Sequence, residues 1–130
     1  MASDVIFSQY NGSSIPLSNI VESGNGYVRY SDGTQICYGT FGIGNRTYSS
    51  NGYARYDLIY PKTFDALPAA GIANIDNVQP TSLSTKVKAN FSIMSCGGSS
   101  SDLFIYVYNG NSESVKASVY LNYIAIGRWK

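Results

Sequence analysis

Several segments of the chain alternate apolar and polar residues with a period of two, which is the pattern of a β-strand, and others are short runs of strand-forming residues between turn signals. Together these patterns predict strands over residues 27–30, 34–42, 51–60, 70–78, 86–96, 102–108 and 118–128. No stretch has a helical period of useful length. Short strands at this spacing favour an antiparallel β-sandwich, an all-β fold.

Turn residues separate the predicted strands. Asp32 and Gly33 form a strong two-residue hairpin signal, and Asn51 with Gly52 opens another strand. The cluster 109–112 predicts the turn between the last two strands. Phe64 and Pro68 are expected at a packed corner after the third strand.

The first residues differ in composition from the rest of the chain. Residues 1–24 are rich in Ser, Asn and Gly and contain Pro16, which predicts an extended arm before the folded domain. Two regions are therefore expected, an arm over 1–25 and a sandwich domain over 26–130.

Two predicted strands carry large apolar side chains on both faces. In strand 102–108 one face carries Leu103, Ile105 and Val107, and the other carries Phe104, Tyr106 and Tyr108. In strand 118–128 the two sets are Tyr120, Ile124 and Ile126, interrupted by Asn122, and Val119, Leu121, Tyr123 and Ala125. A sandwich strand normally has one wet, polar face. We therefore expect another subunit to cover the second face.

Tyrosine is unusually frequent, with twelve residues. Tyr with Gly, Ser and Asn is typical of adaptable binding surfaces, although Tyr also fills strands. The segment Asn25–Tyr30 recurs as Asn51–Tyr56, and in both copies a Tyr and an Arg lie two residues apart on one face. This pair suits either a ligand platform or a solvated strand edge.

Charge and targeting signals limit the partners. Charged residues make up 13% of the chain and the net charge is +1, which does not favour nucleic acid or an anionic membrane. No apolar run approaches the roughly 20 residues of a membrane helix, so no membrane insertion is expected. No signal peptide is recognised, so we expect synthesis in the cytoplasm. The chain then either stays in the cytosol or leaves the cell by another route, such as assembly into a particle.

The sequence offers little for catalysis. It has no histidine and no nucleotide, hydrolase-elbow or metalloprotease motif, so we expect no metal, no cofactor and no enzyme activity. Cys37 and Cys96 lie in apolar strands and are expected to be buried free thiols. A glycosidase pair such as Asp57 with Asp102 stays open as an alternative.

Three segments together carry a resemblance. They are residues 26–39, which include the Asp32–Gly33 turn, the Tyr60-Pro61 pair followed by Phe64 and Pro68, and the terminal run from Tyr123 to Arg128. Over residues 26–130 the chain resembles the C-terminal domain of bacteriophage tail-fibre and receptor-binding proteins of the gp53-like type. That fold is similar to H-type lectins. The family's terminal motif usually starts with Trp, and Tyr123 stands there in this chain.

The resemblance implies a sandwich of about six strands, assembled as a parallel homotrimer at the distal tip of a virion tail fibre. It implies that residues 1–25 end a fibre shaft and that other tail-fibre or baseplate proteins are partners. It also implies recognition of a host cell-surface polysaccharide or other glycan.

The residues of the last two strands supply the candidates for this role. By position, we expect ligand binding at Tyr106, Tyr108, Asn109 and Tyr120, with interface packing as the alternative for each. The expected trimer interface is Tyr120, Ile124, Ile126 and Phe104.

The sequence thus favours a non-enzymatic receptor-binding tip domain made in the host cytoplasm. The alternative is a structural domain that trimerises and caps a fibre without binding a ligand. A small glycan-active enzyme is the third and least favoured hypothesis.

Overall fold

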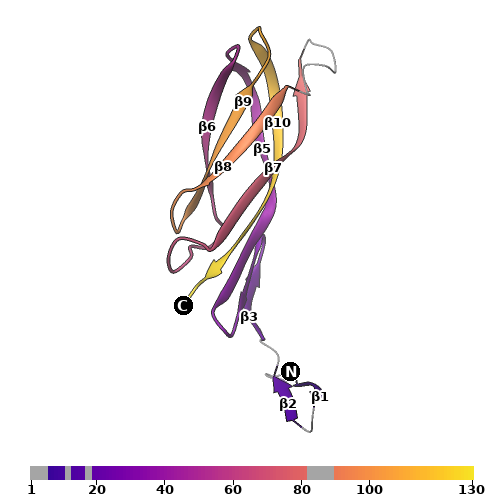
Figure 1. Cartoon of the computed structure of the whole chain (residues 1–130), viewed down its shortest axis with the longest axis vertical. Coiled ribbons are helices and arrows are strands. Elements are labelled where there is room, and N and C mark those ends of the chain that lie inside the picture. The colour runs from indigo at the N-terminus through magenta and orange to yellow at the C-terminus, as the bar shows by residue number, and fades with distance from the viewer. Residues whose placement is uncertain (1–5, 11–12, 17–18, 82–89) are drawn as a thin grey trace.

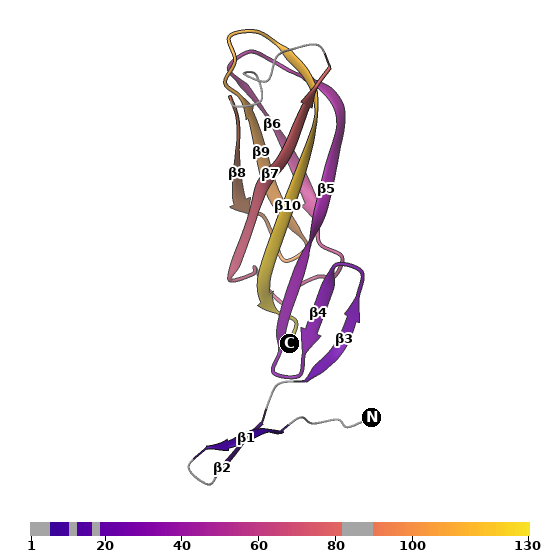
Figure 2. The same ribbon diagram turned by 90° about the vertical axis from the view of Figure 1, so that its right-hand side faces the viewer.

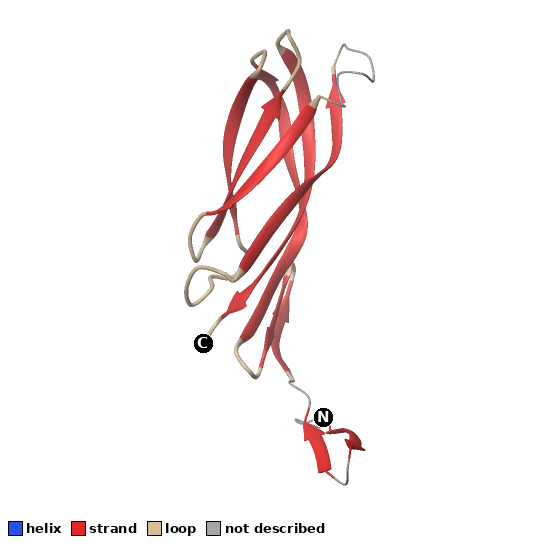
Figure 3. Cartoon of the chain, in the orientation of Figure 1, coloured by secondary structure: helices blue, strands red, loops and turns tan. Residues whose placement is uncertain are grey.

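The computed structural model describes residues 6–10, 13–16, 19–81 and 90–130. Every regular element within these ranges is a β-strand, as Figure 3 shows. The ten strands are β1 (Ile6–Tyr10), β2 (Ser13–Pro16), β3 (Ile20–Gly24), β4 (Tyr27–Tyr30), β5 (Thr34–Tyr48), β6 (Gly52–Ile59), β7 (Ala70–Pro80), β8 (Phe91–Gly97), β9 (Asp102–Asn109) and β10 (Val115–Arg128).

Two antiparallel sheets pack face to face and form an elongated sandwich (Figures 1 and 2). One sheet has the order β3-β4-β5-β10-β7 and the other has the order β6-β9-β8, while β1 and β2 pair only with each other. The predicted all-β antiparallel sandwich is confirmed. The sheets hold five and three strands, rather than about six in total.

The predicted strands agree with the observed ones except at some ends. Strand β5 continues to Tyr48 because it pairs with β10 over its whole length, which holds Gly42 and Gly44 in the strand despite their low strand propensity. Residues 20–24 also form a strand, β3, which pairs with β4. The five-stranded sheet therefore begins within the region expected to be the arm. The predicted strand over 86–96 is observed from Phe91, and residues 86–89 lie outside the described residues.

The turn residues follow the predicted chemistry. Gly33 has a φ of 98°, which favours glycine, and the preceding Asp32 carboxylate accepts a hydrogen bond of 2.8 Å from the Thr34 amide. Asn51 has a φ of 49°, in the left-handed region that Asn tolerates better than most residues. The Asp32–Gly33 turn joins the paired strands β4 and β5, whereas the turn at Asn51 leads from β5 to β6 in the other sheet.

The two strands with large side chains on both faces are interior strands, each paired on both sides within its sheet. β9 lies between β6 and β8, and β10 lies between β5 and β7. Their inward side chains form the middle of the core and are fully buried: Leu103, Ile105, Val107, Val119, Leu121 and Ala125. The predicted division of each strand into two faces is therefore confirmed.

The corner after β6 closes the lower end of the core. Phe64 is buried against Tyr60, with their ring centroids 5.0 Å apart, as expected for a packed corner. The same corner lies over Gly127, where an added Cβ would come within 2.8 Å of the Phe64 ring and 2.9 Å of Pro68 Cα. Gly127 is therefore required by close packing.

Replacing Gly127 with alanine is expected to lower the free energy of unfolding by about 1–3 kcal/mol, because the corner must move to admit the methyl group. The measurement is urea unfolding followed by circular dichroism. The matched control is Gly44→Ala, since a Cβ at Gly44 meets nothing within 4 Å. Equal stability of the two variants would contradict this account of Gly127.

Candidate binding surface

The outward side of the three-stranded sheet carries a cluster of large side chains. The strand registers place Tyr53, Tyr108 and Ser92 in one row across β6, β9 and β8. Arg55, Tyr106 and Met94 form the next row, and Asp57 and Phe104 begin a third. We call this surface the three-strand face and define it by Tyr53, Met94, Phe104, Tyr106 and Tyr108.

The rings of the three-strand face stand at angles to one another. Tyr53 and Tyr106 have ring centroids 5.7 Å apart and an interplanar angle of 64°. Tyr53 is 70% exposed and Met94 is 58% exposed, so both offer most of their surface to a partner. A pocket of about 430 Å³ lies over the first two rows and is lined by Tyr53, Ser92, Ile93, Met94, Tyr106 and Tyr108. These side chains stand on paired strands, which fixes their positions.

Arg55 lies beside this pocket, and its positive charge is paired with Asp57. Its Nε donates a 2.9 Å hydrogen bond to Asp57 Oδ1, and Nη2 lies 3.3 Å from Oδ2. The guanidinium carbon stands 3.8 Å from the centroid of the Phe104 ring. The hydrogen bond to Asp57 is the main cause that raises the pKa of Arg55. The ion pair and the ring together hold this cation in place.

The outward side of the five-stranded sheet is a second apolar surface. Ile124 of β10 is flanked by Tyr38 of β5 and Ile72 of β7, and Ile126 lies one row below between Ile36 and Ala70. We call this surface the five-strand face and define it by its exposed side chains: Tyr38, Ile72, Tyr120, Ile124 and Ile126. Each of them is 40–53% exposed.

The four predicted ligand residues do not lie together. Tyr106 and Tyr108 are on the three-strand face, whereas Tyr120 is on the opposite side of the sandwich, where its ring lies over Gly42. Asn109 is fully buried, and its side chain bonds to the backbone of Tyr48, Ser49, Glu113 and Asn111. Its amide is used within the fold and is not available to a ligand, which corrects the expectation for Asn109.

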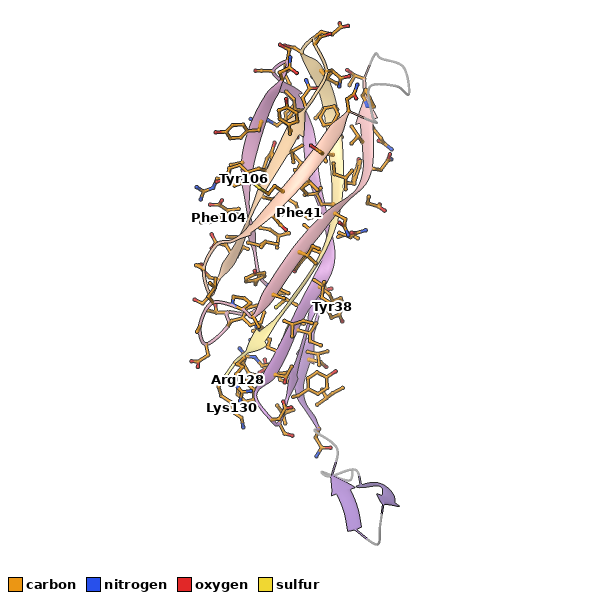
Figure 4. All side chains as sticks on the ribbon, viewed as in Figure 1. Tyr38, Phe41, Phe104, Tyr106, Arg128 and Lys130 are labelled. Atoms are coloured by element: carbon orange, nitrogen blue, oxygen red, sulfur yellow. The ribbon has the colours of Figure 1, made fainter. Side chains whose placement is uncertain are left out.

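The predicted interface residues are also divided between the two faces. Tyr120, Ile124 and Ile126 share the five-strand face, and Phe104 lies on the three-strand face under Arg55. Figure 4 shows Phe104 and Tyr106 on one side of the sandwich and Tyr38 on the other. Phe104 is therefore not part of one continuous surface with Ile124.

Sequence reasoning did not select Tyr53, Met94, Tyr38 or Ile72. Tyr53 belongs to the repeated Asn-Gly-Tyr-x-Arg-Tyr segment, and this repeat is the sequence signal that could have identified it. The two copies differ in setting. Tyr53 is on the three-strand face, but Tyr27 of the first copy is half-buried and donates to Glu22 at 2.7 Å. Met94 joins the three-strand face, and Tyr38 and Ile72 join the five-strand face, only through the register of neighbouring strands.

The carboxylates considered for catalysis both have structural contacts. Asp57 is paired with Arg55, and Asp102 accepts a hydrogen bond from the Ser99 hydroxyl. They lie diagonally on β6 and β9, since Asp57 is opposite Phe104 and Asp102 is opposite Ile59. Each carboxylate is held by its neighbour, so the arrangement does not favour the acid and base of a glycosidase.

The remaining chemical groups are few. Cys37 is a buried free thiol whose pKa is raised by burial, while the side chain of Cys96 lies outside the described residues. Within residues 6–10, 13–16, 19–81 and 90–130, no three His, Cys, Asp or Glu side chains gather as a metal site. The same residues contain no helix long and apolar enough to span a membrane.

The fold is similar to two solved structures of pyocin tail fibres. The chain matches a P. aeruginosa R1 pyocin fibre fragment, C-terminal residues 323–701, with a TM-score of 0.56 and 13% identity. It matches an N-truncated R1-type pyocin tail fibre with a TM-score of 0.57 and 13% identity. The alignments cover 85% of this chain, and they cover 28% of the first fibre chain and 85% of the second.

No protein-family model and no curated protein matches the sequence. At this identity, the likeness to the pyocin fibres shows the fold alone. The chain is therefore an antiparallel β-sandwich whose fold is similar to that of these tail-fibre structures.

Proposed function

We propose that this chain is the receptor-binding tip domain of a phage or prophage tail fibre and that it recognises host cell-surface glycans without catalysis. The observation that carries the proposal is the three-strand face, where exposed aromatic rings border a pocket on rigid strands. Flat rings beside hydroxyl groups suit the apolar and polar sides of a sugar. The similarity to tail-fibre structures supports the proposed place in a tail fibre, and the resemblance to H-type lectin-like tips supports a glycan as the ligand.

The proposal includes a homotrimer assembled through the five-strand face. Its large side chains stand half-exposed in neighbouring rows on β10 and its two flanking strands, β5 and β7, which is unusual for a solvated sheet. Contact between copies would leave the three-strand face of each subunit open. Three weak sites on each fibre tip would then attach a particle firmly by avidity.

In this proposal the domain is made in the host cytoplasm and assembled into the virion with other tail-fibre or baseplate proteins. The expected location is the distal end of the fibre. The residues that precede β3 would lead toward the shaft.

Replacing Tyr108 with alanine is expected to reduce adsorption of the isolated domain to host cells about tenfold, because one wall of the pocket is lost. The measurement is a pull-down with bacterial cells, with light scattering to check the assembly. Ser50→Ala, an exposed change in the β5–β6 turn, is the control. Absence of binding by the unchanged domain to every candidate host envelope would overturn the proposal.

A structural cap without a ligand is the second candidate, and the apolar five-strand face favours it. The two functions differ in their response to substitutions on opposite faces. A cap predicts that Tyr108→Ala leaves particle adsorption intact, and that only changes on the five-strand face have an effect, through loss of assembly.

A further inference from the structure

We infer that the pocket over Tyr53, Tyr106 and Tyr108 binds a neutral sugar ring, and that Asp57 keeps acidic glycans out by holding Arg55. This inference rests on the proposed function and names the ligand class of the same site. Asp57 is thereby a specificity-determining residue, although it does not line the pocket.

The shape of the pocket suits a small saccharide. Tyr53 and Tyr108 stand directly opposite each other on β6 and β9, and Tyr106 meets Tyr53 at 64° one row below. One ring can therefore lie under the C–H face of a sugar while another borders its edge. The volume of about 430 Å³ is at the small end of ligand pockets, which suits a mono- or disaccharide.

The position of Tyr108 is fixed by its neighbours. A Cβ added at Gly110 would come within 3.3 Å of the Tyr108 ring and 2.9 Å of the Asn90 carbonyl oxygen. The Gly110 amide donates a 2.9 Å hydrogen bond to that same carbonyl. The ring thus packs against a tight backbone contact, which reduces the entropy lost when a ligand binds.

The chemistry of the lining is neutral. The described residues that line the pocket are tyrosines, Ser92, Ile93 and Met94, and none of them is charged. Hydroxyl groups both donate and accept hydrogen bonds, as sugar hydroxyls do. A carboxylate or sulfate on a glycan would lose hydration here and, among these lining residues, would gain no opposite charge.

Arg55 is the cation that stands next to these rows, opposite Tyr106. Its two hydrogen bonds to Asp57 are bidentate, and the Phe104 ring covers one face of the guanidinium at 3.8 Å. Bidentate pairing is the same geometry with which an arginine would bind a glycan carboxylate. Asp57 therefore occupies the Nε–Nη2 edge of Arg55, with which the carboxylate of an acidic ligand would otherwise pair, and neutralises its charge.

The first test is an array of immobilised oligosaccharides that carries neutral hexose and N-acetylhexosamine glycans beside their sialylated, uronic-acid and sulfated counterparts. We expect the unchanged domain to bind neutral members, and Tyr53→Ala to weaken this binding about tenfold, because the most exposed ring is lost. Tyr53 is 70% exposed, so the variant should fold normally. If Tyr53→Ala left the binding of neutral glycans unchanged, the binding site would lie elsewhere and the inference would be wrong.

The second test is Asp57→Asn on the same array. Removing the carboxylate charge leaves Arg55 with an uncompensated charge beside the pocket, so we expect binding of acidic glycans to rise about tenfold while neutral binding is kept. The control is Asp76→Asn, which removes the same charge from an exposed position on β7 in the other sheet. An equal gain in both variants would show an effect of net charge and contradict the role of Asp57.

The two proposals fail in different ways. One contrary outcome is that the unchanged domain prefers acidic glycans and loses this binding in Tyr53→Ala. That result would overturn the inferred selectivity for neutral glycans, but receptor recognition by this site would stand. Failure to bind any glycan and any host envelope would overturn both.

Discussion

Replacing Asn109 with alanine is expected to lower the free energy of unfolding by about 3 kcal/mol, because buried backbone groups lose their hydrogen-bond partner. Asn109 has no exposed surface. Its Nδ2 lies 3.1 Å from the carbonyl oxygens of Tyr48 and Ser49 and 3.2 Å from that of Glu113. Its Oδ1 accepts hydrogen bonds of 2.9 and 2.8 Å from the amide and side chain of Asn111.

This one side chain joins the β5–β6 turn to the segment between β9 and β10 at the upper end of the sandwich. Few other groups have the donors and acceptor needed to replace it. The measurement is urea unfolding at a fixed protein concentration, since assembly adds concentration-dependent stability.

Asn45→Ala is the matched control, because Asn45 is exposed on β5. We expect its effect on the free energy of unfolding to stay within about 0.5 kcal/mol. If Asn109→Ala instead kept full stability and lost cell adsorption, the original expectation of a ligand role for Asn109 would be restored.

Ile124→Asp is expected to convert the proposed trimer into single chains. Ile124 is 42% exposed and lies between Tyr38 and Ile72 in the middle of the five-strand face. In a trimer, a carboxylate at this position would be buried in all three subunits without an opposite charge, which costs several kcal/mol. Each subunit should still fold, because the side chain points away from the core.

Light scattering measures this effect as a fall in mass to one third, and circular dichroism checks that the strands are retained. Ile59→Asp is the control, since it makes the same substitution at an exposed position of the three-stranded sheet. If Ile59→Asp dissociated the trimer and Ile124→Asp did not, the interface would lie on the side of the three-stranded sheet, and the proposed five-strand face would be wrong. A single-chain mass for the unchanged protein would remove the trimer altogether.

The assignment of strands depended on local signals that the sequence contains. Asp32-Gly33 and Asn51-Gly52 are turn pairs whose backbone angles follow from the residues themselves. Alternation separated Leu103, Ile105 and Val107 from Phe104, Tyr106 and Tyr108, because successive side chains on a strand point to opposite sides. Low-propensity glycines in β5 concealed its second half, where pairing with β10 outweighs local preference.

The candidate site was less accessible to such reasoning. Tyr106 and Tyr108 were found because they alternate on one strand, but Tyr53 joins them only through the pairing of β6 with β9. Asn109 follows Tyr108 directly and resembles a polar turn residue in sequence, although it is buried and bonded to the distant β5–β6 turn as well as to the segment that follows it.

The sequence was sufficient to establish an all-β chain, the limits of most strands and the two-faced character of the strands that became β9 and β10. Those properties depend on neighbours along the chain, so local propensity and a period of two are enough to determine them. The order of strands in the sheets placed Tyr120 and Tyr108 on opposite sides of the sandwich and brought Phe104 of β9 under Arg55 of β6. These arrangements depend on contacts between distant segments, which alternation within one strand does not encode.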